Sequence, residues 1–171
     1  MARSSVVPGR FTAQREGAFV VFVIGMRINK LWQVWKWLPT ARAMGPMIRE
    51  LLSTPGSGLQ HYEMMRRGRT VVLLQYWDSF EQLSAYARNP DQEHLPAWRA
   101  FNRRVGTDGS VGIFHETYLV PAGGFEAIYN NMPRFGLAAA GEHVPVARRG
   151  QSAAYRAGRT EEDVPAEPVP V

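Results

Sequence analysis

Long apolar runs alternate with segments of helical periodicity in the first half of the chain. Residues 18–28, AFVVFVIGMRI, are apolar almost throughout, which predicts a strand that is buried on both faces. From residue 31 to residue 52, apolar side chains recur every three or four positions and predict a helix. Pro39 and Pro46 lie inside this pattern, so we expect them to break or kink the helix.

A more polar run and a second apolar run follow a loop rich in Ser, Pro and Gly. Residues 59–65 predict a strand, and the polar side chains of His61 and Glu63 favour a place at the edge of a sheet. Residues 70–77, TVVLLQYW, predict another strand that is apolar on both faces. The short Arg-Gly-Arg segment between these two strands predicts the turn of a hairpin.

The following segment predicts a second helical region and a last strand. Asp78 or Ser79 is expected to cap a helix, which is interrupted near residue 90 and resumes over residues 96–105. Residues 110–120 predict the fourth strand, which a Pro-Ala-Gly-Gly segment ends.

The predicted order, strand-helix-strand-strand-helix-strand, is the split βαβ arrangement of ferredoxin-like folds, in the α+β class. This topology places the first and third strands in the middle of the sheet, in agreement with their uniformly apolar character. Two helices cover only one face of such a sheet. The other apolar face needs a second layer, which an identical subunit supplies. We therefore expect a homodimer that forms an α+β barrel.

The composition along the chain divides it into four parts. Residues 1–16 predict an N-terminal arm that becomes ordered only by docking, and residues 17–122 the ferredoxin-like domain. Residues 123–140 keep apolar and aromatic side chains, so we expect them to pack as a C-terminal extension. Residues 141–171 lose this pattern and gain proline, which predicts a flexible tail.

Composition and charge narrow the classes of partner. A chain of 171 residues, 45% of them hydrophobic, suffices for one domain with a sizeable core. The net charge of +5 invites a nucleic-acid interpretation, but the basic residues are spread along the chain, so we expect no nucleic-acid partner. No apolar run has the length of a membrane span or a secretory signal, so we expect a cytoplasmic protein. Cysteine is absent, and no metal site is predicted.

One candidate for chemistry lies in the second helical region. His94, Trp98 and Asn102 are spaced four and four, so they share one stripe if the helix extends back to residue 94. Pro96 leaves open the alternative that His94 lies in a loop and has a structural role.

A second candidate lies in the fourth strand. Its alternation sends His115 to one face and both Glu116 and Tyr118 to the other, so one of His115 and Glu116 faces the helices. A buried Glu116 requires either a cationic partner or a functional role. Trp37 and Tyr76 are further polar aromatic residues near the sheet, where packing is the simpler interpretation.

The chain also contains a series of characteristic strings. They are GRFT at residues 9–12, VVFVIGMRIN, WLP, LLQYWDSFEQLSAYAR, AWRAFN after His94, VGIFHETY, and FEAIYNNMP followed by GL. This series, over about residues 9–140, resembles a family named after a fumagillin-pathway monooxygenase. The resemblance implies the fold of antibiotic-biosynthesis monooxygenases, which are dimeric barrels with a pocket between sheet and helices. Its motif positions in this chain are His94, Trp98, Asn102, His115, Glu116 and Tyr118.

The resemblance implies a small-molecule enzyme of a biosynthetic pathway, foremost a monooxygenase that needs no cofactor. Such chemistry requires a dry pocket, a base and an oxyanion donor. His94 or His115 is the expected base, and Trp98, Asn102 and Tyr118 are the expected donors or walls.

Three alternatives stay open at this point. Glu116 with a histidine suffices for hydrolysis, dehydration or cyclisation on the same pocket. Haem is a further option, with His94 or His115 as the axial ligand. The last alternative is a binding dimer without catalysis. The candidate catalytic residues are therefore His94, His115 and Glu116, and the candidate substrate-binding residues are Trp37, Tyr76, Trp98, Asn102 and Tyr118.

Overall fold

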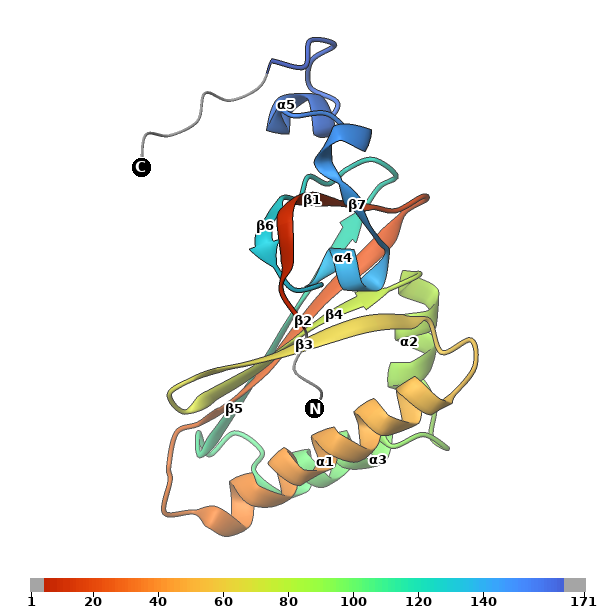
Figure 1. Cartoon of the computed structure of the whole chain (residues 1–171). Coiled ribbons are helices and arrows are strands. Elements are labelled where there is room, and N and C mark those ends of the chain that lie inside the picture. Colours follow the sequence, from red (N-terminus) through yellow and green to blue (C-terminus); the bar gives the residue numbers. More distant parts are fainter. Residues whose placement is uncertain (1–4, 165–171) are drawn as a thin grey trace. The chain divides into compact units, whose positions relative to one another are not determined.

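The computed structural model describes residues 5–164, and the chain folds into two compact units (Figure 1). One unit consists of Val20–Leu119 and contains the main sheet with its helices. The other unit is built from both ends of the chain, up to Phe19 and from Val120 onward.

The main sheet has four strands in the order β3-β4-β2-β5. Strand β4 pairs antiparallel with both β2 and β3. The strands are β2 (Phe19–Ile28), β3 (Leu59–Arg67), β4 (Thr70–Trp77) and β5 (Val111–Val120). The two uniformly apolar strands, β2 and β4, are the central ones, so the predicted ferredoxin-like order and strand positions are confirmed.

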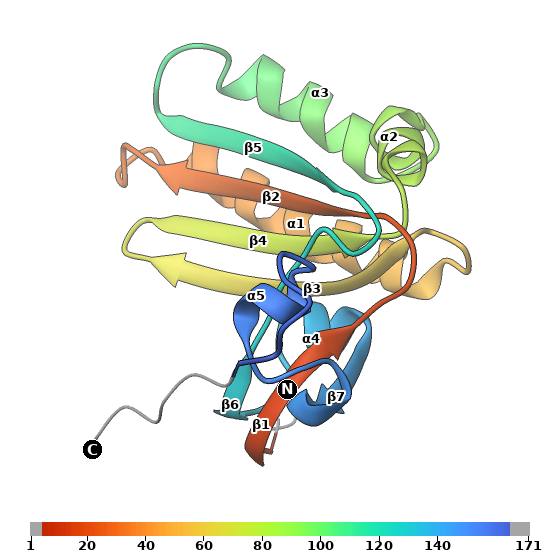
Figure 2. The ribbon, with the colours of Figure 1, turned by 90° about the horizontal axis from the view of Figure 1, so that it is seen from above.

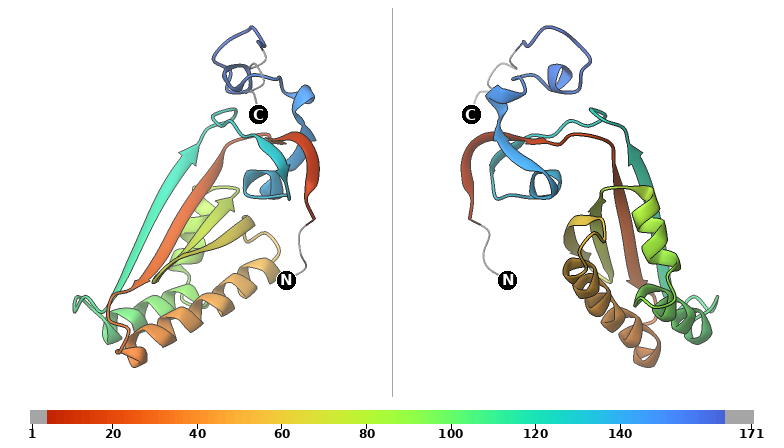
Figure 3. Two further views of the ribbon diagram at one scale, coloured as in Figure 1. Left: turned by 60° about the vertical axis from the view of Figure 1, so that its left-hand side comes forward. Right: turned by 90° about the vertical axis from the view of Figure 1, so that its right-hand side faces the viewer.

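Helices cover one face of this sheet (Figures 2 and 3). They are α1 (Val34–Ser53), α2 (Phe80–Arg88) and α3 (His94–Arg104). The Ser79 side chain accepts a hydrogen bond from the backbone N–H of Gln82, which caps α2. Helix α3 begins at His94, two residues before the predicted start, because Pro96 fits within a first helical turn that needs no N–H donor there.

Helix α1 continues through both of its prolines. Pro39 and Pro46 lie inside the span of α1, so of the break or kink that the sequence predicts, a break does not occur. Each proline removes one N–H donor from the helix. The buried side chains of Ile48 and Leu51 hold the helix on the sheet, and this packing favours a continuous helix over the local preference.

Two apolar clusters fix the helices to the sheet. One contains Val20, Leu51, Leu59, Trp77, Leu83 and Tyr86, and thus joins β2, β3 and β4 to α1 and α2. The other contains Met26, Phe101, Val105 and Val111, and joins β2 and β5 to α3. Trp37 and Ala41 of α1 also pack against this second cluster, so α1 is held on the sheet at both places.

The second unit joins segments that are far apart in the sequence. Its small sheet has the order β6-β1-β7. The elements are β1 (Val7–Gln14), β6 (Tyr129–Met132), α4 (Leu137–Ala140), β7 (Glu142–Pro145), η1 (Val146–Arg148) and α5 (Ala153–Arg156). The segment expected to be an arm thus contributes the central strand, and Thr12 in it is 2% exposed and donates to the Ala127 carbonyl at 2.7 Å.

The segment expected to be a flexible tail from residue 141 contains secondary structure as far as Arg156. Strand β7 pairs with β1, from Phe11 opposite Pro145 to Gln14 opposite Glu142. Pairing between segments so far apart leaves no signal in the local pattern of a four-residue strand. The end of the predicted tail, residues 165–171, lies outside the described residues.

Arg156 provides a test of packing in this unit. Its side chain is buried, donates to the Glu126 carboxylate at 2.5 Å and 2.9 Å, and donates to the carbonyls of Gly150 and Gln151. Arg156→Met would leave these acceptors without their donor. We expect the free energy of unfolding to fall by about 2 kcal/mol, measured by urea denaturation of the full chain.

The matched control is Arg159→Met, because Arg159 is exposed. We expect a change of less than about 0.5 kcal/mol for this variant. Equal stabilities of the two variants would contradict a packing role for residues 150–156.

Candidate functional site

A cavity of about 850 Å³ lies between the main sheet and its helices. This volume is in the range of small-molecule sites in proteins. Strands β2, β4 and β5 form its floor, and α1, α2 and α3 form its roof. Most of the lining is apolar or aromatic, including Phe22, Met44, Met47, Trp77, Trp98 and Phe101. The cavity can therefore desolvate an apolar ligand of moderate size.

His94 is the polar group of the roof that is best suited to accept a proton. It lies at the first position of α3, and its Nδ1 is 3.1 Å from the carbonyl oxygen of Ala87. A carbonyl oxygen only accepts hydrogen bonds, so Nδ1 carries the proton and the neutral ring has its lone pair on Nε2. The end of α2 thus fixes the tautomer of a histidine that lines the cavity.

Tyr86 of α2 packs against the His94 ring and joins α2 to α1 through a hydrogen bond. Its ring centroid lies 5.9 Å from that of His94 and 6.1 Å from that of Trp77. The Tyr86 hydroxyl donates to the Glu50 carboxylate of α1 at 3.2 Å. Burial, followed by the nearby Glu50 charge, raises the pKa of Tyr86 well above its ordinary value. Tyr86 therefore stays neutral and serves as a hydrogen-bonding link in the roof.

His115 belongs to the floor of the same cavity, on the edge strand β5. Its ring centroid is 5.7 Å from that of Phe22 on β2. The side chain is exposed in the single chain, so water reaches His115 more easily than His94. Thr117, two residues further along the same strand, also lines the cavity.

Glu116 and Tyr118 lie on the opposite face of β5, as alternation along a strand requires. Neither lines the cavity, and the Tyr118 hydroxyl donates to the Glu116 carboxylate at 2.5 Å. This hydrogen bond raises the pKa of Tyr118. The sequence alone leaves open whether His115 or Glu116 faces the helices. In the structure, His115 faces them and Glu116 does not.

Three other predicted site residues also lie away from the cavity lining. Trp37 packs against the cluster around Met26 and donates its indole N–H to the Leu31 carbonyl at 2.9 Å. Tyr76 lies on the face of β4 opposite the cavity. Asn102 is exposed, because eight helical positions carry it about 80° around α3 from His94. The structure thus brings together His94, Trp98 and His115, and separates them from the other five.

The lining also contains residues that the sequence analysis does not single out. Gln75 is 5% exposed and its Oε1 accepts a hydrogen bond from the Trp77 indole N–H at 2.9 Å. Arg88 and Arg104 also reach the cavity from α2 and α3. The sequence does contain a signal for Gln75: it is the single amide within the apolar run 71–77, and alternation places it on the same face as Leu73 and Trp77.

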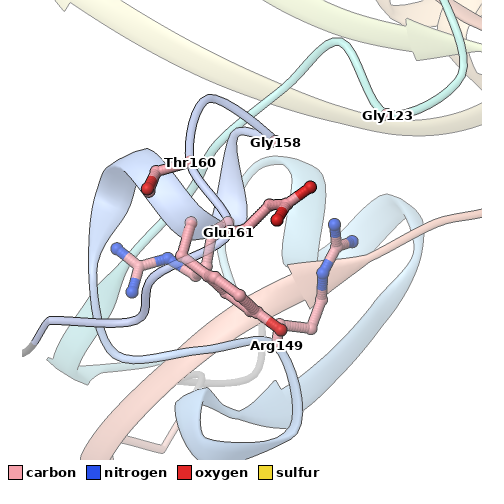
Figure 4. A pocket seen from close by; sticks show the side chains of 7 residues that line it. Gly123, Arg149, Gly158, Thr160 and Glu161 are labelled. Atoms are coloured by element: carbon pink, nitrogen blue, oxygen red, sulfur yellow. The ribbon is translucent and has the colours of Figure 1, made fainter.

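A second pocket, of about 500 Å³, lies in the unit formed by the chain ends (Figure 4). Its two arginines already have partners. The Arg149 guanidinium lies 5.2 Å from the centroid of the Phe125 ring, and Arg156 binds Glu126. None of the predicted site residues lines this pocket, so the cavity of the main sheet is the candidate site.

Residues 5–164 contain neither a clustered metal site nor a membrane-spanning helix. No group of three or more His, Asp or Glu side chains there is arranged to hold a metal ion. None of the helices in that range combines the length and the apolarity needed to cross a bilayer.

Residues 19–137 match the model of the family described as monooxygenase af470-like. The matched range contains every residue that lines the cavity. The monooxygenase af470 of Aspergillus fumigatus is 28% identical over 150 residues, which are 75% of this chain and 52% of that protein. The chain therefore spans about half the length of this relative.

Solved structures with a similar arrangement share little sequence with the chain. SnoaB, a cofactor-independent oxygenase from Streptomyces nogalater, is 13% identical with a TM-score of 0.42, and the match covers 58% of this chain and 90% of SnoaB. A dimeric ferredoxin-like protein of unknown function from Jannaschia sp. CCS1 is 16% identical with a TM-score of 0.41. That match covers 57% of this chain and 97% of the Jannaschia protein.

The hydrogen bond from Tyr86 to Glu50 can be tested through stability. Tyr86→Phe keeps the buried ring and removes the hydroxyl that links α2 to α1. We expect the free energy of unfolding to fall by about 1 kcal/mol in urea denaturation at pH 7. Tyr155→Phe, at a residue that is 40% exposed, is the matched control and should change stability by less than about 0.5 kcal/mol. A Tyr86 variant as stable as this control would show that the link contributes nothing.

Proposed function

Because the chain belongs to the monooxygenase af470-like family, we propose that its cavity is the active site of a small-molecule oxygenase. This enzyme oxidises an apolar substrate with dioxygen and uses neither a flavin nor a metal. The observation that carries the proposal is the contact of His94 Nδ1 with the Ala87 carbonyl, which leaves the lone pair of the neutral ring on Nε2 in a histidine that lines an apolar cavity. A general base in such a site removes a proton from carbon most effectively when water is excluded.

The reaction balances without an external reductant if the substrate is an enolisable ketone with an acidic CH₂ group. The Nε2 atom of His94 takes one proton, and the electron pair of that C–H bond moves into the enolate. The enolate carbon reduces dioxygen and forms a C–O bond to give a peroxide. Loss of the second C–H proton breaks the O–O bond, so the CH₂ group becomes a carbonyl and water leaves. All four electrons that dioxygen accepts come from the substrate.

His115 completes the proposal as the group that protonates the departing oxygen. It lies on the floor of the same cavity and is open to water, from which it regains its proton. Non-oxidative catalysis by Glu116 with a histidine is disfavoured, since the Glu116 side chain lies on the other face of β5.

Haem is the alternative occupant of this cavity. The Nε2 of His94 is free to act as an axial ligand, and Arg88 and Arg104 carry charges that suit propionate groups. Bound haem would supply oxygen activation at its iron. The purified protein distinguishes the two possibilities, because only the haem form has a strong absorbance band near 400 nm, a general property of haem.

We also propose that the enzyme is a cytoplasmic homodimer. The helix-free face of the sheet presents half-buried or exposed apolar side chains, among them Val21, Val23, Leu74 and Phe114. Gly25 keeps this face closely packed, since a Cβ atom there would come within 2.2 Å of the Phe114 ring. Packing of two such faces would bury these side chains and close the barrel.

The oxygenase proposal is tested with anthrone, a flat apolar ketone with an acidic CH₂ group. The expected reaction is anthrone + O₂ → anthraquinone + H₂O, followed by absorbance and oxygen consumption in buffer with a chelator and no flavin. We expect His94→Ala to lower turnover by about a hundredfold or more. Arg103→Ala, at an exposed position of the same helix outside the lining, should keep wild-type turnover.

Two outcomes would contradict the proposal. One is an unchanged rate in a His94→Ala variant that still unfolds cooperatively. The other is anthrone that binds to the wild-type protein without any acceleration of its oxidation.

The dimer is tested by light scattering of the purified chain at micromolar concentration. We expect a mass twice the 19.2 kDa of the single chain. Phe114→Asp places a charge on the helix-free face and should shift the mass towards the monomer. Trp35→Asp, at a residue of α1 that is 64% exposed, should leave the mass unchanged. A folded wild-type monomer would contradict the proposed dimer.

A further inference from the structure

Gln75 is a buried amide in the floor of the cavity. Among the described residues, four polar or charged side chains are buried, and Gln75 is the one of these that lines the cavity. It lies on β4, one of the two central strands, directly opposite Phe22 of β2. Burying an amide among apolar neighbours costs free energy unless its hydrogen-bonding groups find partners. The partners of Gln75 therefore indicate what the cavity is built to bind.

Trp77 determines the orientation of the Gln75 amide. The indole Nε1 of Trp77 donates to Gln75 Oε1 at 2.9 Å, and both side chains lie on the same face of β4. An indole N–H is only a donor, so the amide oxygen must be the end that faces Trp77. The Trp77 side chain is 1% exposed and thus held firmly by its surroundings. The two N–H donors of Gln75 are consequently at the other end of the amide.

These two donors have no acceptor among the described residues. The hydrogen bond of Gln75 with Trp77 uses the amide oxygen alone, and the Gln75 side chain lines the cavity. Gln75 lies opposite Phe22 of β2 and Tyr62 of β3, and it donates a hydrogen bond to neither side chain. A ligand group that satisfies Gln75 must therefore be a hydrogen-bond acceptor, such as a carbonyl or enolate oxygen, and not an ammonium group or a second donor.

We propose that Gln75 binds the carbonyl oxygen of the substrate through its amide N–H groups, with Trp77 as the residue that positions it. This inference rests on the proposed function, because it assigns the oxyanion donor of the same site. His94 lines the roof and Gln75 the floor, linked through the contacts of Trp77 with Tyr86 and of Tyr86 with His94.

His94 and Gln75 act on different atoms of the enolate as it forms: His94 on the carbon that loses the proton, and Gln75 on the oxygen that gains the negative charge. When Nε2 of His94 takes the proton from carbon, the C–H electron pair forms the C=C bond of the enolate. The carbonyl π pair then moves onto oxygen, where the negative charge develops. Donors already aimed at that oxygen stabilise the charge without reorganisation. The substrate class is therefore a rigid apolar ketone whose acidic carbon and carbonyl oxygen reach the roof and the floor together.

The test uses 9-fluorenone, a flat apolar ketone that has no acidic C–H bond and so cannot be oxidised by this route. Its carbonyl stretching frequency falls when the oxygen accepts a hydrogen bond, and infrared difference spectra of the complex report this shift. We expect a lowered frequency in the full wild-type chain. In Gln75→Leu the frequency should return to its value in an apolar solvent, and binding should weaken about fivefold to tenfold.

Three further variants separate the roles. Trp77→Phe should broaden or reduce the carbonyl shift, since the amide loses its fixed orientation. His94→Ala should keep the shift, because binding of the carbonyl does not need the base. Gln60→Leu makes the same change at an exposed glutamine of β3 outside the lining and should leave both the shift and the affinity unchanged.

The results distinguish this inference from the oxygenase proposal. A Gln75-dependent carbonyl shift without anthrone oxidation would support the binding role of Gln75 and overturn the oxygenase. Anthrone oxidation that depends on His94, together with a carbonyl frequency that Gln75→Leu leaves unchanged, would overturn the role of Gln75 alone. Failure of 9-fluorenone to bind the wild-type chain would also overturn it.

A measurement on the unchanged chain covers the case in which Gln75→Leu does not fold. The side-chain NH₂ signals of ¹⁵N-labelled glutamine are recorded with and without 9-fluorenone, and Gln75 is assigned through its proximity to the Trp77 indole. We expect the Gln75 signals to move downfield on addition of the ketone. Signals that stay in place while 9-fluorenone binds would overturn the proposal.

Discussion

The alternation of side chains along the central strands is the constraint on which this architecture depends. In β4, Leu73, Gln75 and Trp77 face the helices, while Leu74 and Tyr76 face the other way. A shift of the pairing by one residue would exchange the two sets, so that the buried amide and the apolar floor would both be lost. The observed register with β2 and β3 therefore sets the fold and the chemistry of the cavity together.

The cavity exists because the helical layer is attached at two separate places. The clusters around Trp77 and Met26 bury the large side chains that hold α1, α2 and α3 on the sheet. Residues of both clusters also line the space between them. Two hydrogen bonds orient the polar groups of the roof. One runs from Tyr86 to Glu50, and the other joins Nδ1 of His94 to the Ala87 carbonyl. Packing and positioning are thus contributed by the same elements.

The chain ends illustrate how distant segments complete one another. Thr12 and Ala13 of strand β1 are buried, and β6 and β7 pair with the two edges of this strand more than a hundred residues later. Arg156 stabilises this unit by donating hydrogen bonds to Glu126 and to two backbone carbonyls. Each of these segments is short and ambiguous by itself, and the free energy that orders it comes from the others.

Local pattern was sufficient for the main sheet, because strands buried on both faces and helices with one apolar stripe have periodicities that can be recognised without their partners. It also placed His94, Trp98 and His115 among the site candidates. It could not tell that His115 lines the cavity whereas Glu116, Asn102 and Trp37 do not, and it did not single out Gln75. Those outcomes depend on which side of each strand and helix meets the other layer, and on pairings such as that of Gln75 with Trp77. Only tertiary packing decides them, since burial and hydrogen-bond partners are properties of the assembled layers and not of any one segment.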